Sequence, residues 1–174
     1  MSPLLGRSEL LALLDELAER LARRGVRAAV YVVGGAAMAL EFDDRRSTRD
    51  IDSVILEGHG PLIEEVRSIA RLRGLPSTWL NDQASRYVAS GDDPGRQVVF
   101  DHPSLSVAAA SAERLLAMKL VAARASDVAD IAALLSLIGI TTVAEAELVL
   151  TEAFADRPLS NRARLIVEDL LGGQ

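Results

Sequence analysis

The sequence predicts an α+β fold, in which a mixed β-sheet flanked by helices is followed by a C-terminal helical bundle. Two observations support this prediction. Short apolar runs typical of strands alternate with helical patterns over the first two thirds of the chain, and every pattern after residue 110 is helical. We therefore expect an α/β core over residues 1–110 and a helical region over residues 111–174, packed together as one compact unit.

The first part of the chain predicts helix, strand, helix and strand in that order. Leucines at helical spacing predict a helix over residues 9–24, which Gly25 ends. The apolar run of residues 26–33 predicts a buried strand, and two glycines lead directly into a second helix over residues 36–42. The polar run DDRRSTRD predicts a loop, after which residues 51–56 alternate as a strand does.

The remainder predicts one more helix, a group of strands and four helices. Pro61 stands in the first turn of the third helix, a position that tolerates proline. Two or three short strands are expected within residues 77–108, between turn-rich segments. Ser111 and Ser126 are the predicted caps of the next two helices, and Gly139 ends the second of them. Two further amphipathic segments complete the chain.

Composition narrows the class of protein. Of 174 residues, 49 % are hydrophobic, yet no uncharged stretch approaches the roughly 20 residues of a membrane-spanning helix. We expect a soluble, cytoplasmic protein without a signal peptide, because acidic residues interrupt the first apolar segment early. The absence of cysteine excludes thiolate metal sites. A net charge of −6 argues against broad binding of duplex DNA.

A strand, two glycines and a helix follow one another directly in VVGGAAMAL. Gly34 and Gly35 would let the backbone approach a ligand closely, and the N–H groups at a helix start favour phosphate. The alternative is steric, since a strand-to-helix turn needs glycine whether or not it binds anything. The motif alone is therefore a weak indication of a phosphate-binding turn.

Asp50 and Asp52 stand two residues apart at the start of the second strand. Residues two apart on a strand face the same side, so both carboxylates project together while Ile51 faces the core. Paired carboxylates repel each other unless a cation lies between them, and oxygen ligands suit Mg²⁺ carrying the phosphates of a nucleotide. The alternative is a pair of solvated acids at a strand end.

The spacing between the two motifs links them. A helix-length insert of 15 positions leads from Gly35 to Asp50, which allows the second strand to return beside the first. The glycine turn and the acids would then meet at one end of the sheet. Ser47, Thr48 and Arg49 immediately precede the acids and are candidates to contact the same phosphates, the alternative being a polar turn.

Lys119 is the only lysine among 19 basic residues and lies within an apolar helical run. An ammonium differs from a guanidinium in reach and geometry, so this lysine is one that arginine could not replace. The alternative is that a single lysine remains in the sequence by chance. Arg124, Asp127 and Asp130 follow at spacings of three, which on a continuous helix would form an ion-pair ladder. Asp127 also fits helix capping, whereas Asp130 is the more unusual acid because apolar residues surround it.

Together, VGGAAMAL, RRSTRDIDSVI and LLAMKLVAARASDVADIAAL resemble minimal nucleotidyltransferases of the DNA polymerase β-like superfamily. More narrowly, over residues 28–138, they resemble the abortive-infection type nucleotidyltransferase toxins of type IV toxin–antitoxin systems. The resemblance implies a nucleotidyltransferase-like sheet, with Gly34 and Gly35 at the triphosphate and with Asp50 and Asp52 as catalytic ligands of Mg²⁺.

The resemblance also implies roles in the helical region and a reaction. Lys119 with Asp130 or Asp127 would serve nucleotide binding and catalysis, and Arg124 stands beside them as a candidate for nucleotide binding. The implied reaction is Mg²⁺-dependent transfer of a nucleotide from a nucleoside triphosphate (NTP) to an acceptor hydroxyl on tRNA or protein. An antitoxin protein is the implied partner.

Two departures from the superfamily pattern keep an alternative open. The turn is commonly glycine-serine, so here Ser47 or Thr48 would have to supply the hydroxyl. Active transferases often use a third strand carboxylate, and the candidate strand LSVAAA has none, with Asp101 the only acid nearby. The alternative is a catalytically inactive nucleotide- or partner-binding member of the same fold. A third hypothesis is a structural protein that binds a partner through its helical tail.

Overall fold

The computed structural model describes residues 3–173, which form two compact units. The first unit contains the chain up to Tyr87 together with Arg96–Ala110. The second contains Val88–Gly95 together with the chain from Ser111 onwards. The helices that follow Ser111 are therefore joined in their unit by a loop from earlier in the chain.

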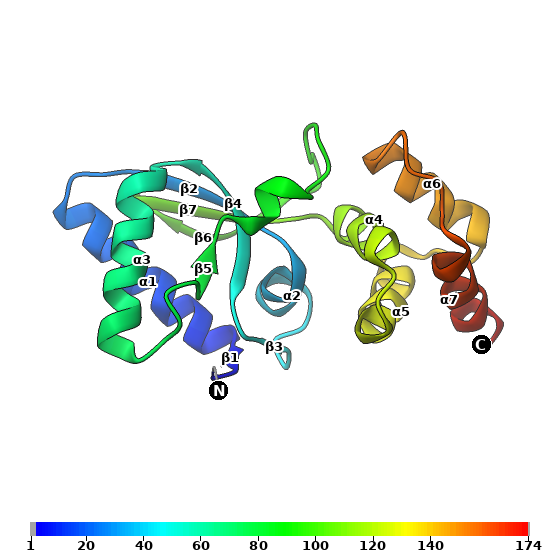
Figure 1. Cartoon of the computed structure of the whole chain (residues 1–174), viewed down its shortest axis with the longest axis horizontal. Helices are drawn as coiled ribbons and strands as arrows, with labels where there is room; N and C mark the ends of the chain where they lie inside the picture. The colour runs from blue at the N-terminus through cyan, green and yellow to red at the C-terminus, as the bar shows by residue number, and fades with distance from the viewer. Residues whose placement is uncertain (1–2, 174) are drawn as a thin grey trace. The chain divides into compact units, whose positions relative to one another are not determined.

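Strands and helices alternate along the first unit (Figure 1). In chain order its elements are β1 (Leu5–Gly6), α1 (Arg7–Arg23), β2 (Ala28–Val32), α2 (Gly34–Ala37), the π-helix η1 (Met38–Phe42), β3 (Ser47–Thr48), β4 (Ile51–Glu57), α3 (His59–Arg73), β5 (Leu80–Asn81), the 3₁₀-helix η2 (Gln83–Arg86), β6 (Gln97–His102) and β7 (Leu105–Ala109). Among the described residues, five strands form a sheet in the order β5-β4-β2-β7-β6. β2 pairs antiparallel with β4 and parallel with β7. The mixed sheet with its helices confirms the predicted α+β class.

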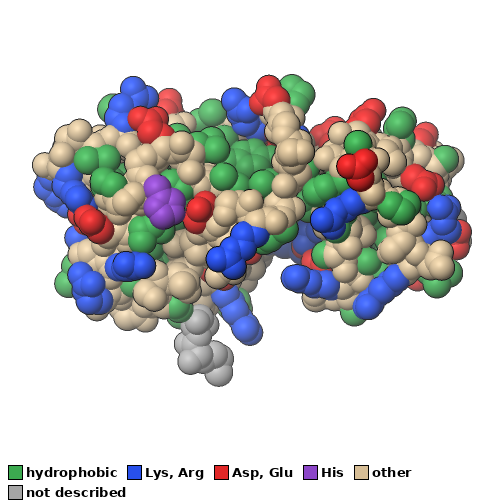
Figure 2. Space-filling view, turned by 45° about the horizontal axis from the view of Figure 1, so that its top comes forward, with side chains coloured by type: hydrophobic (Ala, Val, Ile, Leu, Met, Phe, Trp, Pro, Cys, Tyr) green, Lys and Arg blue, Asp and Glu red, His purple; other side chains and the backbone are tan. Residues whose placement is uncertain are grey.

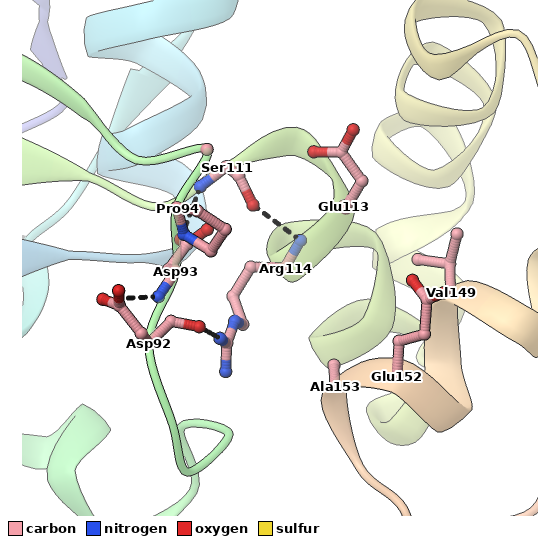
Figure 3. Close-up of a pocket in the computed structure, with 10 residues that line it drawn as sticks. Asp92, Asp93, Pro94, Ser111, Glu113, Arg114, Val149, Glu152 and Ala153 are labelled. Atoms are coloured by element: carbon pink, nitrogen blue, oxygen red, sulfur yellow. Dashed lines mark hydrogen bonds between the residues drawn. The ribbon is translucent and has the colours of Figure 1, made fainter.

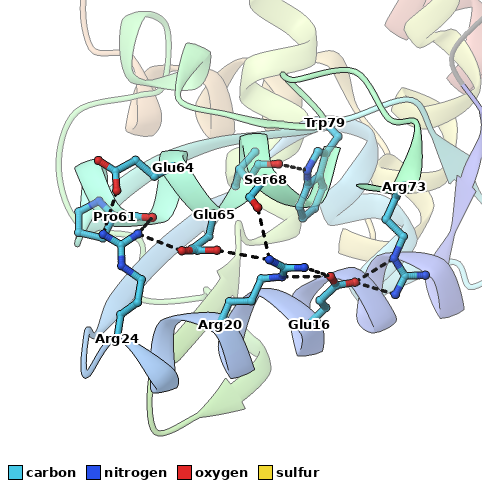
Figure 4. Close-up of polar contacts among 10 residues, drawn as sticks. Glu16, Arg20, Arg24, Pro61, Glu64, Glu65, Ser68, Arg73 and Trp79 are labelled. Atoms are coloured by element: carbon cyan, nitrogen blue, oxygen red, sulfur yellow. Dashed lines mark hydrogen bonds and ion pairs between the residues drawn. The ribbon is translucent and has the colours of Figure 1, made fainter. Parts of the chain in front are cut away.

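The helices α1 and α3 lie side by side, joined at their surface by ion pairs (Figure 4). The leucines that predicted the first helix are all buried, namely Leu10, Leu13, Leu14, Leu17 and Leu21. At the solvent side, Arg73 of α3 donates to Glu16 of α1 at 2.6 Å, and Arg24 donates to Glu65 at 3.0 Å. Partly exposed pairs of this kind contribute little stability, so the apolar contact holds the two helices and the ion pairs orient them.

Two details of the first unit differ from the prediction. The helix after β2 begins at Gly34, two residues earlier than expected, with Val33 as its cap. The run DDRRSTRD is not wholly loop, because Ser47 and Thr48 form β3, which pairs with β1. Backbone pairing with a distant two-residue strand leaves no periodic pattern in the sequence. The short strands β5, β6 and β7 confirm the strands expected near residues 77–108.

Helices make up most of the second unit. In the part of this unit that the structure describes they are α4 (Ala112–Ala122), the 3₁₀-helix η3 (Ala125–Asp127), α5 (Val128–Ile138), α6 (Val143–Ala153) and α7 (Asn161–Gly172). Ser111 caps α4 as predicted, accepting a hydrogen bond from the backbone N–H of Arg114 at 3.1 Å. The predicted cap at Ser126 is wrong. Ala123 takes a left-handed conformation and the chain then forms η3, so Asp127 is the residue that precedes α5.

Arg114 and Asp93 hold the loop of residues 88–95 in the second unit. The buried guanidinium of Arg114 donates to three carbonyl oxygens of the loop, those of Ala89, Ser90 and Asp92. Asp93 accepts a hydrogen bond from the backbone N–H of Ser111 at 2.9 Å (Figure 3). Buried carbonyl groups need donors, so the arginine replaces the pairing that a strand would provide. The loop, α4 and α6 line a pocket of about 340 Å³.

No single helix within residues 3–173 is long and apolar enough to cross a membrane. Taken together, the segments Ala125–Ile138 and Val143–Ala153 have the length and composition of a membrane-spanning segment. The chain bends by 96° at the break between them. On the face drawn in Figure 2, basic side chains are interspersed with acidic ones over both units.

Candidate functional site

The glycine turn and the acid pair meet at one end of the sheet in the first unit. β2 ends at Val32, which lies opposite Ser53 near the start of β4. The backbone N–H of Val33 donates to the carbonyl oxygen of Asp52 at 3.0 Å, which extends the pairing one residue beyond β2. Because an antiparallel return places the end of one strand beside the start of the next, Gly34 lies next to Asp52.

Gly34 and Gly35 are favoured at their positions for different reasons. Gly34 has φ +64°, a left-handed conformation that side chains other than glycine rarely adopt. A Cβ atom on Gly34 would lie 3.9 Å from Oδ2 of Asp52, so the carboxylate faces the turn. A Cβ atom on Gly35 would lie 3.1 Å from Oγ1 of Thr48. The first N–H groups of the helix have no acceptor within it, which leaves them for an anion at this end.

Asp50 and Asp52 flank Ile51, whose side chain is fully buried, while both acids are partly exposed. The alternation confirms that Ile51 faces the core, which puts Asp52 on the other side of β4. Asp50 lies in the bend that precedes the strand. Burial raises the pKa of Asp50, the negative charge of Asp52 raises it further, and Arg49 opposes the shift. The charge of Arg49 therefore does not offset the combined effect of burial and of Asp52 on Asp50.

The donor set of the acid pair fits Mg²⁺. This ion prefers oxygen ligands and commonly takes one or two carboxylates from the protein, with its other ligands from phosphates and water. Within residues 3–173, no group of three or more His, Cys, Asp and Glu side chains is arranged to hold a metal ion. A cation at Asp50 and Asp52 would therefore depend on a bound triphosphate for further ligands.

Of the residues before the acids, from Ser47 to Arg49, Thr48 lies near both motifs. Ser47 and Arg49 are exposed, whereas Thr48 is half-buried. The Thr48 hydroxyl donates to the carbonyl oxygen of Asp50 at 3.0 Å. Contacts of these three residues with phosphate stay predictions.

β5 places Asn81 beside Asp52, a neighbour that sequence reasoning missed. The strands β4 and β5 are parallel with these two residues in register, so their side chains share a face of the sheet. Asn81 is buried, and its amide donates to the carbonyl oxygen of Thr78 and accepts from the N–H of Gln83. Ser53, also buried, donates to the carbonyl oxygen of Asn81 at 2.7 Å. Because β5 has only two residues, it shows no alternation of polar and apolar residues in the sequence. The one indication of its place was the polar Asn81 directly after two apolar residues.

Asp101 lies away from the acid pair. It pairs with Ser106, which in turn pairs with Ala29 near the start of β2, whereas the acids lie beside the other end of β2. The register of the β6–β7 hairpin therefore prevents Asp101 from serving as a third carboxylate. At the site end of the sheet the described strands carry Val32, Asp52, Asn81, Gln97 and Ala109, of which Asp52 alone is an acid.

Lys119 belongs to a cluster in the second unit. Its ammonium is 2.9 Å from Oδ1 of Asp127 and 2.7 Å from Oδ2 of Asp130, and all three side chains are largely buried. The predicted ladder required a continuous helix, but α4 ends at Ala122 and Arg124 is exposed, so Lys119 takes the place expected for that arginine. One ammonium between two carboxylates leaves a formal charge of −1. The role of Lys119, Arg124, Asp127 and Asp130 toward a nucleotide stays a prediction.

Residues 8–164 match the model of a protein family described as nucleotidyltransferase of unknown function (DUF6036). The chain belongs to this family. Membership in DUF6036 confirms the resemblance to nucleotidyltransferases that the motifs indicated, and the matched residues include the glycine turn, the acid pair and the Lys119 cluster. No curated protein matches the chain.

One solved structure is similar to this DUF6036 member. It is an antigenic nucleotidyltransferase-like protein from Paracoccidioides brasiliensis, 17 % identical, with a TM-score of 0.46 and coverage of 94 % of this chain and 95 % of that one. Family membership indicates nucleotidyl transfer as the class of activity. The nucleotide, the acceptor, the use of Mg²⁺ and the type IV toxin role stay predictions.

Proposed function

We propose that this protein transfers a nucleotide from an NTP to an acceptor hydroxyl on tRNA or protein, with Mg²⁺ at Asp50 and Asp52. The observation that carries the proposal is the meeting of two motifs at one end of the sheet. A turn suited to phosphate lies against a carboxylate pair that lacks compensating charge, with the Gly34 Cβ position 3.9 Å from Asp52 Oδ2. A triphosphate with its cation supplies what both motifs need.

In the proposed reaction the acceptor oxygen attacks the α-phosphorus of the NTP. The bond from that phosphorus to the bridging oxygen of the β-phosphate breaks, pyrophosphate leaves, and the hydroxyl proton passes to solvent. Backbone N–H groups from Gly34 onward hold the phosphates, and Asp50 and Asp52 would hold the cation that the phosphates share. Mg²⁺, when bound with the triphosphate, would supply positive charge against the charge that builds on phosphorus and the leaving group.

A transfer assay tests the proposal directly. The protein is incubated with Mg²⁺ and each of the four NTPs, labelled at the α-phosphate, together with total tRNA or a cell protein extract. Label should appear in one acceptor fraction, and Asp52→Ala should reduce it by about 100-fold or more. Asp44→Ala is the matched control, because Asp44 is an exposed acid of the preceding loop. No transfer from any NTP, or transfer that survives Asp52→Ala, would overturn the proposal.

Lys119 is included in the proposal as a nucleotide-binding residue, and its being the sole lysine makes it easy to probe. An amine-acetylating reagent can modify only Lys119 and the α-amino group, so mass spectrometry reads its accessibility without ambiguity. Acetylation of Lys119 should slow in the presence of Mg²⁺ and the preferred NTP, while acetylation of the α-amino group should not. Equal rates with and without nucleotide would contradict a role of Lys119 in nucleotide binding.

The second candidate function is nucleotide binding without turnover. It is favoured by the single strand carboxylate, Asp52, among the described residues at the site end of the sheet. Calorimetry separates the two candidates, because an inactive member binds an NTP with Mg²⁺ tightly but yields no labelled product in the transfer assay.

The narrower proposal is that the protein is the toxin of a type IV toxin–antitoxin system, with an antitoxin protein as its partner. Its support is the resemblance of the motifs from VGGAAMAL to the Lys119 helix. Expression should arrest growth, Asp52→Ala should relieve the arrest, and co-expression of a protein encoded next to it should do the same. Normal growth at high expression of the active protein would contradict the toxin role.

A further inference from the structure

Thr48 contacts both halves of the candidate site. Its hydroxyl donates to the carbonyl oxygen of Asp50 at 3.0 Å, which closes the turn that leads the chain from β3 into β4. The same oxygen lies 3.1 Å from the position of a Cβ atom on Gly35, and the Thr48 Cβ atom lies 3.5 Å from that position. One side chain therefore holds the backbone at the acid pair and lies against the glycine turn.

Gly35 is glycine because of space rather than conformation. Unlike Gly34, it does not have a positive φ, so an ordinary residue would suit its backbone. A Cβ atom at position 35 would contact the Thr48 hydroxyl oxygen so tightly that Thr48 would have to shift by a few tenths of an ångström. Positions 35 and 48 are therefore coupled sterically.

The backbone of Thr48 is fixed from its other side. β3 pairs antiparallel with β1, and Thr48 is in register with Leu5, which is buried. An outward shift of Thr48 to admit a larger group at position 35 would therefore act against the β1–β3 pairing and on the hydroxyl–carbonyl hydrogen bond to Asp50.

We propose that Thr48 is a positioning residue, which sets the separation between the glycine turn and Asp50 and thereby the fit of a triphosphate with its cation. This inference rests on the proposed function of the same site. A ligand that bridges the turn and the acids is sensitive to their separation, because a displacement of about 1 Å in such a site costs up to roughly 100-fold.

A double-mutant cycle tests the proposal, with affinity for each Mg²⁺–NTP complex (ATP, GTP, CTP and UTP) measured by calorimetry. Gly35→Ala should weaken binding about 10-fold because its Cβ atom crowds Thr48, and Thr48→Ala should weaken it about 5-fold by freeing Asp50. In the double variant the shortened residue at 48 makes room at 35, so its affinity should be no worse than that of Thr48→Ala. If the two losses multiply instead, the proposal is overturned.

Two near-isosteric variants separate positioning from packing and guard against unfolded protein. Thr48→Ser keeps the hydroxyl bond to Asp50 and should bind within about 2-fold of wild type, whereas Thr48→Val keeps the volume, loses the bond and should bind as weakly as Thr48→Ala. The reverse order would mean that Thr48 only packs, which contradicts the proposal. Asp44→Ala is the control, since Asp44 is an exposed residue of the loop before β3 with no assigned role in the site and should leave affinity unchanged.

The outcomes distinguish this inference from the function on which it rests. If wild type binds none of the four Mg²⁺–NTP complexes, the proposed function fails and the positioning role fails with it. If wild type binds one of them and positions 35 and 48 act independently, the positioning role alone is overturned.

Discussion

Each unit contains a pair of carboxylates that are partly or largely buried. The pair in the first unit is Asp50 and Asp52, and the pair in the second is Asp127 and Asp130. The second pair shares the ammonium of Lys119, at 2.9 and 2.7 Å. In the first pair the pKa of Asp50 is raised by burial and by the charge of Asp52, with the opposing effect of Arg49 too small to cancel them. Aspartate is therefore paired directly with a cation in one place, whereas in the other a neighbouring arginine only partly opposes the raised pKa.

The difference bears on stability. Removing the cation from a largely buried cluster leaves unpaired charge and costs stability, whereas a carboxylate pair with a raised pKa gains stability when a cation binds to it. The comparison predicts opposite responses of the two pairs to substitution, to added metal and to pH.

The largest expected effect is the loss of the Lys119 ammonium. Lys119→Ala leaves two largely buried carboxylates without their cation, which should lower the free energy of unfolding by about 3 kcal/mol. Urea denaturation measures the change. Arg124→Ala is the matched control and should stay within about 0.5 kcal/mol of wild type, because Arg124 is exposed. Equal stability of the Lys119 variant and wild type would remove the contrast between the two pairs.

Ligand binding should act on the first pair in the opposite direction. Mg²⁺ with the preferred NTP at ten times its Kd should stabilise the folded protein by about 1.4 kcal/mol, since only the folded state binds it. Thermal unfolding with and without the ligand measures this gain. Asp52→Asn should abolish it, whereas Asp44→Asn should keep it. A gain that persists in Asp52→Asn would place the binding elsewhere.

The pH dependence of stability should reveal the raised pKa of Asp50. Because the folded state holds this proton more tightly than the unfolded state, the contribution is fully present below the unfolded pKa and is lost as pH rises through the folded value. Without metal, wild type should therefore lose stability relative to Asp50→Asn as pH rises, by at most about 1 kcal/mol because solvent screens a partly exposed group. Parallel pH profiles of the two proteins would contradict the shift.

The smallest expected effect concerns the corner that carries the Lys119 cluster. Ala123 has φ 45°, a left-handed conformation that destabilises the fold by about 1–2 kcal/mol for an L-residue. Burial of its methyl group stabilises the fold by about 0.8 kcal/mol. Ala123→Gly should therefore gain about 0.5 kcal/mol with the cluster intact. Ala122→Gly, in the last turn of α4, should instead lose about 0.5–1 kcal/mol. A loss in both variants would show that the corner is not strained.

Local patterns and spacing were sufficient to predict the features that depend on neighbours in sequence. The leucine periodicity of α1, the cap at Ser111 and the buried Ile51 between two acids all follow from period and side-chain chemistry. The approach of Gly34 to Asp52 was also predictable, because a helix-length insert between two strands allows an antiparallel return. The candidate site in the first unit was accessible from sequence for this reason.

The features that were missed depend on contacts between distant segments. Arg114 holds the loop of residues 88–95 in the second unit through hydrogen bonds to backbone carbonyl groups. Every residue has a backbone carbonyl, so the sequence does not show which of them the arginine binds. Asn81 lies beside Asp52 through a strand too short to show alternation. The cap predicted at Ser126 was wrong because Ala123 takes a left-handed conformation, which shifts the start of the next helix. Alanine rarely adopts this conformation, so nothing in the sequence indicated it there.

The position of β7 in the sheet has a consequence for biosynthesis. β7 lies between β2 and β6, yet it is the last strand of the first unit to be made. While the chain emerges from the ribosome, β2 and β4 can form their antiparallel pair, but the other edge of β2 stays uncovered until Ala109 has left the exit tunnel. The nascent protein thus carries an open strand edge from the emergence of Val32 until that of Ala109, a surface on which chaperones act and at which premature pairing with a neighbouring chain begins.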